Sequence, residues 1–187
     1  MNESKKTLFV DFFASTDREV VLKFRDFCSR LIEQHSPDVL YLAFSSHGGD
    51  NSNAFYLYNF LRSLPCELVT HCTSVAGSSG LTLFLAADTR YACSASRFLI
   101  HGPIWTYDGR HQVSIPKMRE HLGILQRDED AHKRIMLERT TATQAQLDDF
   151  HLHGANLTAE QARDCGFVHD IRPFTRPKGV PIFGFTT

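Results

Sequence analysis

Short apolar runs alternate with segments of helical periodicity along the first half of the chain. Residues 7–13 and 39–44 have the length and apolar content of buried strands. Between these runs, apolar residues recur at helical spacing, and Thr16 with Glu19 predicts a capping box at the start of that helix. The alternation then continues, with helices predicted at 54–64 and 81–87 and strands at 68–72, 90–93 and 97–101. Such an alternation is typical of an α/β domain.

The second half of the pattern is dominated by one long charged helix. Residues 116–139, or about 113–140 with the flanking turns, carry apolar side chains only loosely on one side. A helix of this length cannot bury itself in a small domain, so it is predicted to be an exposed arm or a surface that packs on another subunit. Beyond it the pattern predicts a short helix at 158–166, opened by Thr158 and Gln161 and closed by Gly166. A strand at 167–171 and an extended Pro-rich tail at about 173–187 are predicted to follow.

The composition restricts the class of protein. With 187 residues and a mass of 21.2 kDa, the chain suits one domain over 1–187, and its 42% of hydrophobic residues supply a core and exclude disorder. A net charge of −1 argues against nucleic-acid binding. Five Cys without CxxC spacing indicate free thiols in a reducing compartment. No signal-peptide core and no membrane-spanning apolar run stand in the sequence, so we expect a cytoplasmic protein without membrane contact.

Two glycine-containing turns follow predicted parallel strands, where an open α/β sheet places its site. The first is Ser46-His47-Gly48-Gly49, and the second places Ser78 between Gly77 and Ser79-Gly80 just before a helix. An oxyanion hole needs two backbone N–H donors from separate segments, which such a pair of turns can supply. Each turn alone also fits a structural interpretation, since glycine ends helices and serine is a common N-cap residue.

A serine nucleophile needs a base, because its hydroxyl group is barely ionised at neutral pH. His101 ends an apolar strand and precedes Gly102 and Pro103, so a rigid turn fixes its place. This position fits a catalytic base and a structural histidine equally. Most of the other histidines fall on predicted helix faces or in strands and are interpreted as structural or solvated, among them His35, His71, His111, His121 and His132.

With these turns and the histidine in this order, residues 39–103 resemble ClpP, the proteolytic subunit of the Clp protease, a serine peptidase family with the ClpP/crotonase-like fold. The family's Ser-Pro-Gly-Gly, Ala-Ser-Met-Gly and Ile-His-Gln-Pro turns appear as Ser46-His47-Gly48-Gly49, Gly77-Ser78-Ser79-Gly80 and Ile100-His101-Gly102-Pro103. The spacing of 29 positions from Gly49 to Ser78 matches the family without a gap. The resemblance covers most of the chain and implies an α/β fold with a repeated β-β-α spiral core and a protruding handle helix.

The resemblance implies roles for the residues of these turns. Ser78 is the implied nucleophile and His101 the implied general base. The backbone N–H groups of Gly49 and Ser79 are the implied oxyanion hole.

The family's third catalytic residue, an aspartate, has no counterpart in this chain. Counting without gaps places Gly154 at its position, and the nearest carboxylates, Asp148 and Asp149, come a turn or more too early. The group that orients the catalytic histidine is therefore absent or replaced, with Asn156, His153 or a water molecule as candidates.

The resemblance also implies partners. The family forms stacked rings that act on peptides or unfolded proteins, and the helix of about 113–140 takes the place of the handle helix that interlocks two rings. The family's N-terminal segment, which faces an unfolding ATPase, is abbreviated here, and its Gly-rich substrate strand is replaced by residues 104–110. Both departures weaken the expectation that a Clp ATPase docks on a homo-oligomer of this chain.

No metal or cofactor is expected. His151 and His153 place two imidazoles on one side of a segment interpreted as extended, but no third ligand stands at a recognised spacing. A Walker-type phosphate loop is absent from the sequence, so any ATP dependence would have to come from a partner.

Three functions are therefore carried forward. The first is a serine-type endopeptidase that cleaves peptides or unfolded proteins through an acyl-enzyme on Ser78 inside a ring oligomer. The second is a catalytically weak or inactive ClpP-like paralogue that acts as a structural or regulatory subunit, which the missing aspartate supports. The third is a crotonase-type acyl-CoA enzyme, ranked last because those enzymes use carboxylates near the oxyanion hole rather than a serine at a helix start.

Overall fold

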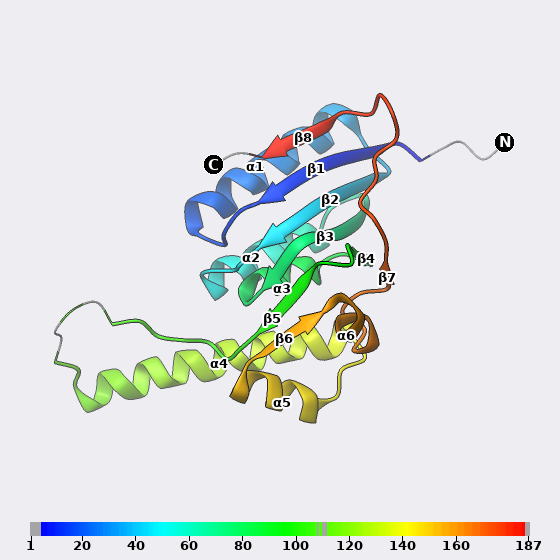
Figure 1. The fold of residues 1–187 in the computed structure, drawn as a ribbon. Coiled ribbons are helices and arrows are strands. Elements are labelled where there is room, and N and C mark those ends of the chain that lie inside the picture. The colour runs from blue at the N-terminus through cyan, green and yellow to red at the C-terminus, as the bar shows by residue number, and fades with distance from the viewer. Residues whose placement is uncertain (1–4, 108, 110–111, 186–187) are drawn as a thin grey trace.

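The computed structural model describes residues 5–107, 109 and 112–185, and its centre is a largely parallel β-sheet (Figure 1). β1 (Thr7–Phe13), β2 (Val39–Ser46) and β3 (Glu67–Gly77) lie side by side in parallel. They form where the sequence has its apolar runs. β2 is buried along almost its whole length, as expected for a central strand of a parallel sheet.

β3 changes its neighbour part-way along its length. Its first half pairs with β4 (Thr89–Ala92) and its last residues pair with β5 (Arg97–Ile100), both in parallel. Beyond β5 lies β6 (Ala155–Thr158), which is antiparallel to it, and beyond β4 lies the short β7 (Asp170–Ile171). At the opposite edge, β8 (Ile182–Phe185) pairs with β1, so the main strand order is β6-β5-β3-β2-β1-β8.

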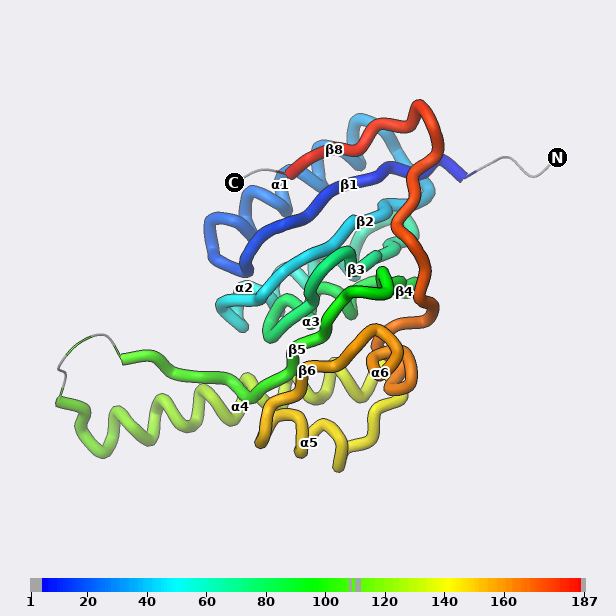
Figure 2. Tube along the Cα trace, viewed as in Figure 1, coloured from blue at the N-terminus to red at the C-terminus, as the bar shows by residue number. Residues whose placement is uncertain are grey.

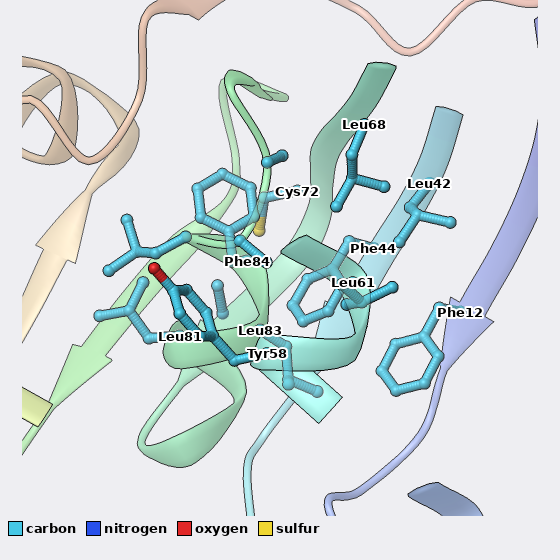
Figure 3. Close-up of a cluster of buried hydrophobic side chains, with 14 of the residues drawn as sticks. Phe12, Leu42, Phe44, Tyr58, Leu61, Leu68, Cys72, Leu81, Leu83 and Phe84 are labelled. Atoms are coloured by element: carbon cyan, nitrogen blue, oxygen red, sulfur yellow. The ribbon is translucent and has the colours of Figure 1, made fainter. Parts of the chain in front are cut away.

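Three helices follow the first three strands and cover the sheet from behind in the view of Figure 1. They are α1 (Arg18–His35), α2 (Asn51–Arg62) and α3 (Ser79–Phe84). Apolar side chains of the sheet, α2 and α3 fill the space between these layers (Figure 3). The rings of Phe12 and Phe44 stack at 5.3 Å, and this packing holds the carboxyl ends of the strands in place.

The long helix predicted from the charge pattern is confirmed as α4 (Ile115–Arg139). Its first half extends beyond the sheet, and the chain that leads into it runs back along it (Figure 2). Its second half packs beside α5 (Gln144–His153), an element that the sequence pattern did not predict. The short helix α6 (Ala159–Asp164) begins with the predicted capping box of Thr158 and Gln161. No helix in the described ranges is both long and apolar enough to span a membrane.

The capping box predicted from Thr16 and Glu19 is wrong. α1 begins at Arg18 with Asp17 at its N-cap position, and no side chain caps it. Thr16 is fully buried, and its hydroxyl oxygen lies 2.8 Å from the hydroxyl oxygen of Ser79. A tertiary hydrogen bond has therefore replaced the local one.

The extended tail predicted for about 173–187 is only partly correct, because its residues 182–185 form β8. Phe185 explains this strand, since its ring packs on Phe12 and Phe24 at 6.1 and 5.0 Å. Of the last predicted strand, 167–171, only Asp170–Ile171 is a strand. Residues 186–187, part of the predicted 104–110 segment and His111 lie outside the described residues.

Candidate active site

Three segments that sequence analysis singled out meet at the carboxyl ends of β2, β3 and β5. Ser46 pairs with Ala76 across β2 and β3, and Gly77 pairs with Leu99 across β3 and β5. The backbone N–H of Ser78 donates to the carbonyl oxygen of Leu99 at 2.7 Å. The structure thus brings the two glycine turns and the strand that ends before His101 to one edge of the sheet.

Ser78 lies in a backbone conformation that serine rarely adopts. Its φ of 52° and ψ of −133° stand between the end of β3 and the start of α3. Residues with such strained dihedrals concentrate at functional sites, where the surrounding structure holds them in place. The Ser78 side chain makes no capping hydrogen bond to α3, so the structural interpretation of this serine as an N-cap has no support in its contacts.

Gly48 approaches the serine turn, and Gly49 approaches Thr16, so closely that no side chain fits at either position. Both have positive φ values, 97° and 147°. A β-carbon at Gly48 would lie 2.8 Å from the Gly77 carbonyl oxygen and from the Ser78 β-carbon, and 3.0 Å from the Ser79 nitrogen. Glycine at this position is therefore what allows the first turn to lie against the start of α3.

Thr16 is a residue of this region that sequence reasoning assigned to another role. Its backbone N–H donates to the Gly48 carbonyl oxygen at 3.1 Å, while its hydroxyl group bonds to Ser79. A β-carbon at Gly49 would lie 2.8 Å from the same hydroxyl oxygen. Thr16 thus ties the glycine turn to the start of α3, a contact that joins residues 63 positions apart and leaves no local signal in the sequence.

His101 is half-buried and lies just beyond the end of β5. Its Nδ1 atom lies 2.7 Å from the carbonyl oxygen of Gly102, so Nδ1–H donates this hydrogen bond and Nε2 carries the free lone pair. The Gly102 N–H in turn donates to the carbonyl oxygen of His151 at 3.0 Å, at the end of α5. An imidazole held in this tautomer can accept a proton at Nε2.

Both the sequence and the fold of this chain resemble those of known proteins. A sequence model of the Clp protease family matches residues 25–173. An ATP-dependent Clp protease proteolytic subunit-like protein of Streptomyces coelicolor is 30% identical over 149 residues, which cover 78% of this chain and 69% of that protein. The chain belongs to the Clp protease family. Among solved structures, an asparagine-to-aspartate mutant of ClpP1 from Listeria monocytogenes matches with a TM-score of 0.78 at 18% identity, over 94% of this chain and 95% of that one.

Membership of the Clp protease family and the structural match confirm the predicted ClpP fold. They also favour the peptidase hypotheses over the acyl-CoA enzyme. The roles of Ser78 and His101 stay predictions, because the likeness to a structure at 18% identity concerns the fold alone.

Gly154 is the residue that counting along the sequence predicts at the position of the family's aspartate. Gly154 ends α5 with a φ of 77°, and the residue after it, Ala155, pairs with Ile100. Because β5 and β6 are antiparallel, Gly154, which precedes Ala155, lies beside His101, which follows Ile100. A β-carbon on Gly154 would lie 4.0 Å from the Ile100 carbonyl oxygen.

Asn156 and His153 are the two side chains that the sequence offers as candidates to orient His101. Within the described part of the chain, neither Asn156 nor His153 hydrogen-bonds to it: Asn156 is exposed on β6, and His153 lies 3.9 Å from Asp149 at the surface. Asp148 bonds to Lys133 at 2.8 Å. The Nδ1–H group of His101 donates to a backbone carbonyl group, that of Gly102.

The two histidines considered for a metal site lie in different surroundings. His151 and His153 belong to helix α5 rather than to an extended segment, so their side chains diverge. His151 is buried and His153 is exposed. In the described ranges, no three His, Cys, Asp or Glu side chains gather closely enough to hold a metal ion.

A groove lies beside Gly49. It has a volume of about 430 Å³ and runs between the start of α2, the 104–106 segment and α4. Trp105 stacks on His121 of α4 at 3.7 Å, and the Tyr107 hydroxyl group lies 2.9 Å from the Nδ1 atom of the same histidine. The segment that the resemblance predicts to replace the family's Gly-rich strand thus packs on α4 and forms one wall of this groove.

Proposed function

We propose that this chain is a serine peptidase that cleaves peptides or unfolded proteins through an acyl-enzyme on Ser78. The observation that carries the proposal is the strained Ser78, whose side chain makes no capping bond, at the strand edge where β5 leads into His101. The tautomer of His101, fixed by the Gly102 carbonyl group, leaves Nε2 free to act as the base. Family membership supports a peptidase rather than another hydrolase.

The proposed reaction follows from these positions. The Ser78 hydroxyl oxygen attacks the peptide carbonyl carbon while its proton passes to His101 Nε2. The oxyanion accepts hydrogen bonds from the N–H groups of Gly49 and Ser79. His101 then gives the proton to the leaving amine, and the amine departs as the acyl-enzyme forms. A water molecule, deprotonated by the same nitrogen, hydrolyses the ester, so the chain needs no metal or cofactor.

We also propose that the active form is a homo-oligomer of stacked rings, with a Clp ATPase as a conditional partner. The first half of α4 supports this part of the proposal, because it extends away from the sheet and exposes large apolar side chains. Ile115, Met118 and Leu122 are each more than half exposed. An equivalent helix of another copy can cover such a surface.

A fluorophosphonate probe tests the assignment of the nucleophile. The probe phosphonylates an activated serine, with fluoride as the leaving group, and intact-protein mass spectrometry counts the adducts. We expect one adduct on the unmodified chain, none on Ser78→Ala, and strongly reduced labelling of His101→Ala. Ser74→Ala, which changes an exposed serine of β3, the strand that leads to Ser78, is the matched control and should label normally. Undiminished labelling of Ser78→Ala would remove the proposal.

The second candidate function is a weakly active or inactive paralogue that serves as a structural or regulatory subunit. The observation that favours it is Gly154, which leaves the aspartate position beside His101 without a side chain. The same experiment separates the two candidates, since such a subunit would assemble but would not label at Ser78.

A further inference from the structure

The groove beside Gly49 combines apolar side chains with negative charge. Its apolar lining comes from the segment before α4 and from α4 itself: Ile104, Trp105, Ile124 and Leu125. Asp50 at the start of α2 and Asp128 on α4 also line it. Within the described residues, no lysine, arginine or histidine contributes to this lining, so the charged groups of the groove are carboxylates.

The Asp128 carboxylate is partly exposed, and a neutral group holds it in place. The side-chain amide of Asn51 donates to its Oδ2 atom at 3.3 Å. Two other carboxylates near it in the fold have a cation as partner, since Glu129 and Asp148 both pair with Lys133, at 2.5 and 2.8 Å. Asp128 has no such ion pair in the described ranges, so its oxygen lone pairs are available to a cation that enters the groove.

The Asp50 carboxylate adds a second negative charge to the same groove. Its Oδ1 atom accepts the backbone N–H of Asn53 at 2.8 Å, which caps α2 and fixes the side chain. Asn51, the residue after it, is the one that bonds to Asp128. Both carboxylates are therefore held by neutral donors, and a cation between the start of α2 and α4 would be attracted by two negative charges.

Trp105 gives the groove an aromatic surface of fixed orientation. Its ring stacks on His121 at 3.7 Å, with 14° between the two planes. His121 is buried and is held in turn by the Tyr107 hydroxyl group. Trp105 itself remains 39% exposed. An indole ring held in this way can pack against the aliphatic stem of a long side chain or against a guanidinium group.

We propose that this groove binds a lysine or arginine side chain of the substrate, close to the bond that is cleaved. The proposal deepens the proposed function and rests on it for one point, the role of the Gly49 N–H beside the reacting carbonyl group. The stem of the basic side chain packs on Trp105, and its charged end pairs with Asp128. An apolar side chain of equal length would fill the same space but leave two carboxylates desolvated without a partner. Charge complementarity thus selects the basic residue.

Equilibrium binding to the Ser78→Ala protein tests this preference without turnover. The full-length variant, in its native assembly, is titrated with two fluorescent peptides that differ at one position and are followed by fluorescence anisotropy. One peptide carries lysine there and the other norleucine, which keeps the aliphatic stem and lacks the ammonium group. We expect the lysine peptide to bind about tenfold more tightly, which corresponds to about 1.4 kcal/mol.

Substitutions in the groove assign this preference to its residues. On the Ser78→Ala background, Asp128→Asn keeps the shape but removes the charge, so the tenfold ratio of dissociation constants should fall to about threefold or less. Asp128→Glu retains the charge and should retain the preference. The matched control is Asp130→Asn, an exposed carboxylate of α4 outside the groove lining, which should leave the ratio unchanged. Trp105→Ala should weaken the binding of both peptides, because both pack on the same ring.

Several results would overturn the proposal. They are equal or tighter binding of the norleucine peptide, an unchanged ratio in Asp128→Asn, full affinity in Trp105→Ala, and no measurable binding of either peptide. Because Ser78→Ala cannot form an acyl-enzyme, these results do not depend on catalysis. The fluorophosphonate experiment alone decides whether Ser78 is the nucleophile, so a failure of the charge preference and a failure of the proposed function can be told apart.

Discussion

At the scale of single residues, Ser78 and Gly48 shape the candidate site, because both have positive φ values and their turns lie against one another. The positive φ of Ser78 directs the chain into α3, and the absence of a side chain at Gly48 lets the neighbouring turn approach within contact distance. These residues were predictable from the sequence because small residues in two turns leave a local pattern. The role of Thr16 was not, because its partner Ser79 is distant in the chain and only the fold brings them together.

Removing the Thr16 hydroxyl group should weaken both the fold and the site. Thr16→Val keeps the shape of the side chain but leaves the buried Ser79 hydroxyl group without its 2.8 Å partner. We expect the free energy of unfolding to fall by about 1–3 kcal/mol, measured by urea denaturation, together with slower labelling of Ser78. Thr16→Ser retains the hydroxyl group and should behave like the unmodified chain. An equal loss in the serine and valine variants would show that packing, not the hydrogen bond, is what matters.

Restoring a carboxylate beside His101 should accelerate the reaction of Ser78. Gly154→Asp places an acid next to the imidazole in the register of β5 and β6, although the φ of 77° adds about 1–2 kcal/mol of strain. Gly154→Asn carries a similar strain without the charge and is the matched control. We expect the aspartate variant to react with the probe about tenfold faster than the asparagine variant. Equal rates in two folded variants would mean that His101 is already fully oriented by other groups.

At the scale of elements, the burial of His132 where α4 packs against α5 makes the free energy of unfolding depend on pH. Burial lowers the pKa of His132 from 6.5 to about 3, whereas the unfolded chain binds this proton below about pH 6.5. The unfolded state then binds more protons, so the free energy of unfolding decreases as the pH falls from about 6.5 toward 3. His132 accounts for up to about 1.4 kcal/mol of this decrease per pH unit.

Urea unfolding between about pH 7 and pH 5 measures this dependence. His132→Phe should flatten the decrease of the free energy of unfolding, while His153→Phe, which changes an exposed histidine, should preserve it. Parallel pH curves for the unmodified chain and His132→Phe would contradict the buried neutral state of His132.

An element could be predicted where neighbouring residues in the sequence specify it, and could not where only tertiary contacts do. β1, β2 and α4 were predicted because strong apolar runs or a long periodic segment specify them locally. β8 was missed because four residues after a Pro-rich stretch become a strand only by pairing with the edge of β1. The burial of His132 on α4 could not be predicted for the same kind of reason, since it depends on how α4 packs against α5 and not on the residues beside it in the sequence.

At the scale of the whole molecule, we expect the exposed half of α4 to determine how copies of the chain associate. Leu122 is 55% exposed on a helix that leaves the body of the fold, so we expect it to be covered by another copy (Figure 1). Leu122→Glu should shift the sedimenting species toward the 21.2 kDa monomer, because burying the charge opposes association. Leu22→Glu, at an exposed leucine of α1, should leave the assembly unchanged. Sedimentation velocity of the unmodified chain as a monomer at micromolar concentration would contradict the oligomer itself.

The central claim, that Ser78 forms an acyl-enzyme, is tested most directly by trapping that species. The full-length protein is mixed with an activated peptide ester, quenched in acid after a short time, and measured by intact mass and peptide mapping. The proposed function predicts a mass increase equal to one acyl group, located on Ser78 and absent from Ser78→Ala. An acyl group on another residue, or ester hydrolysis that continues unchanged in Ser78→Ala, would contradict it.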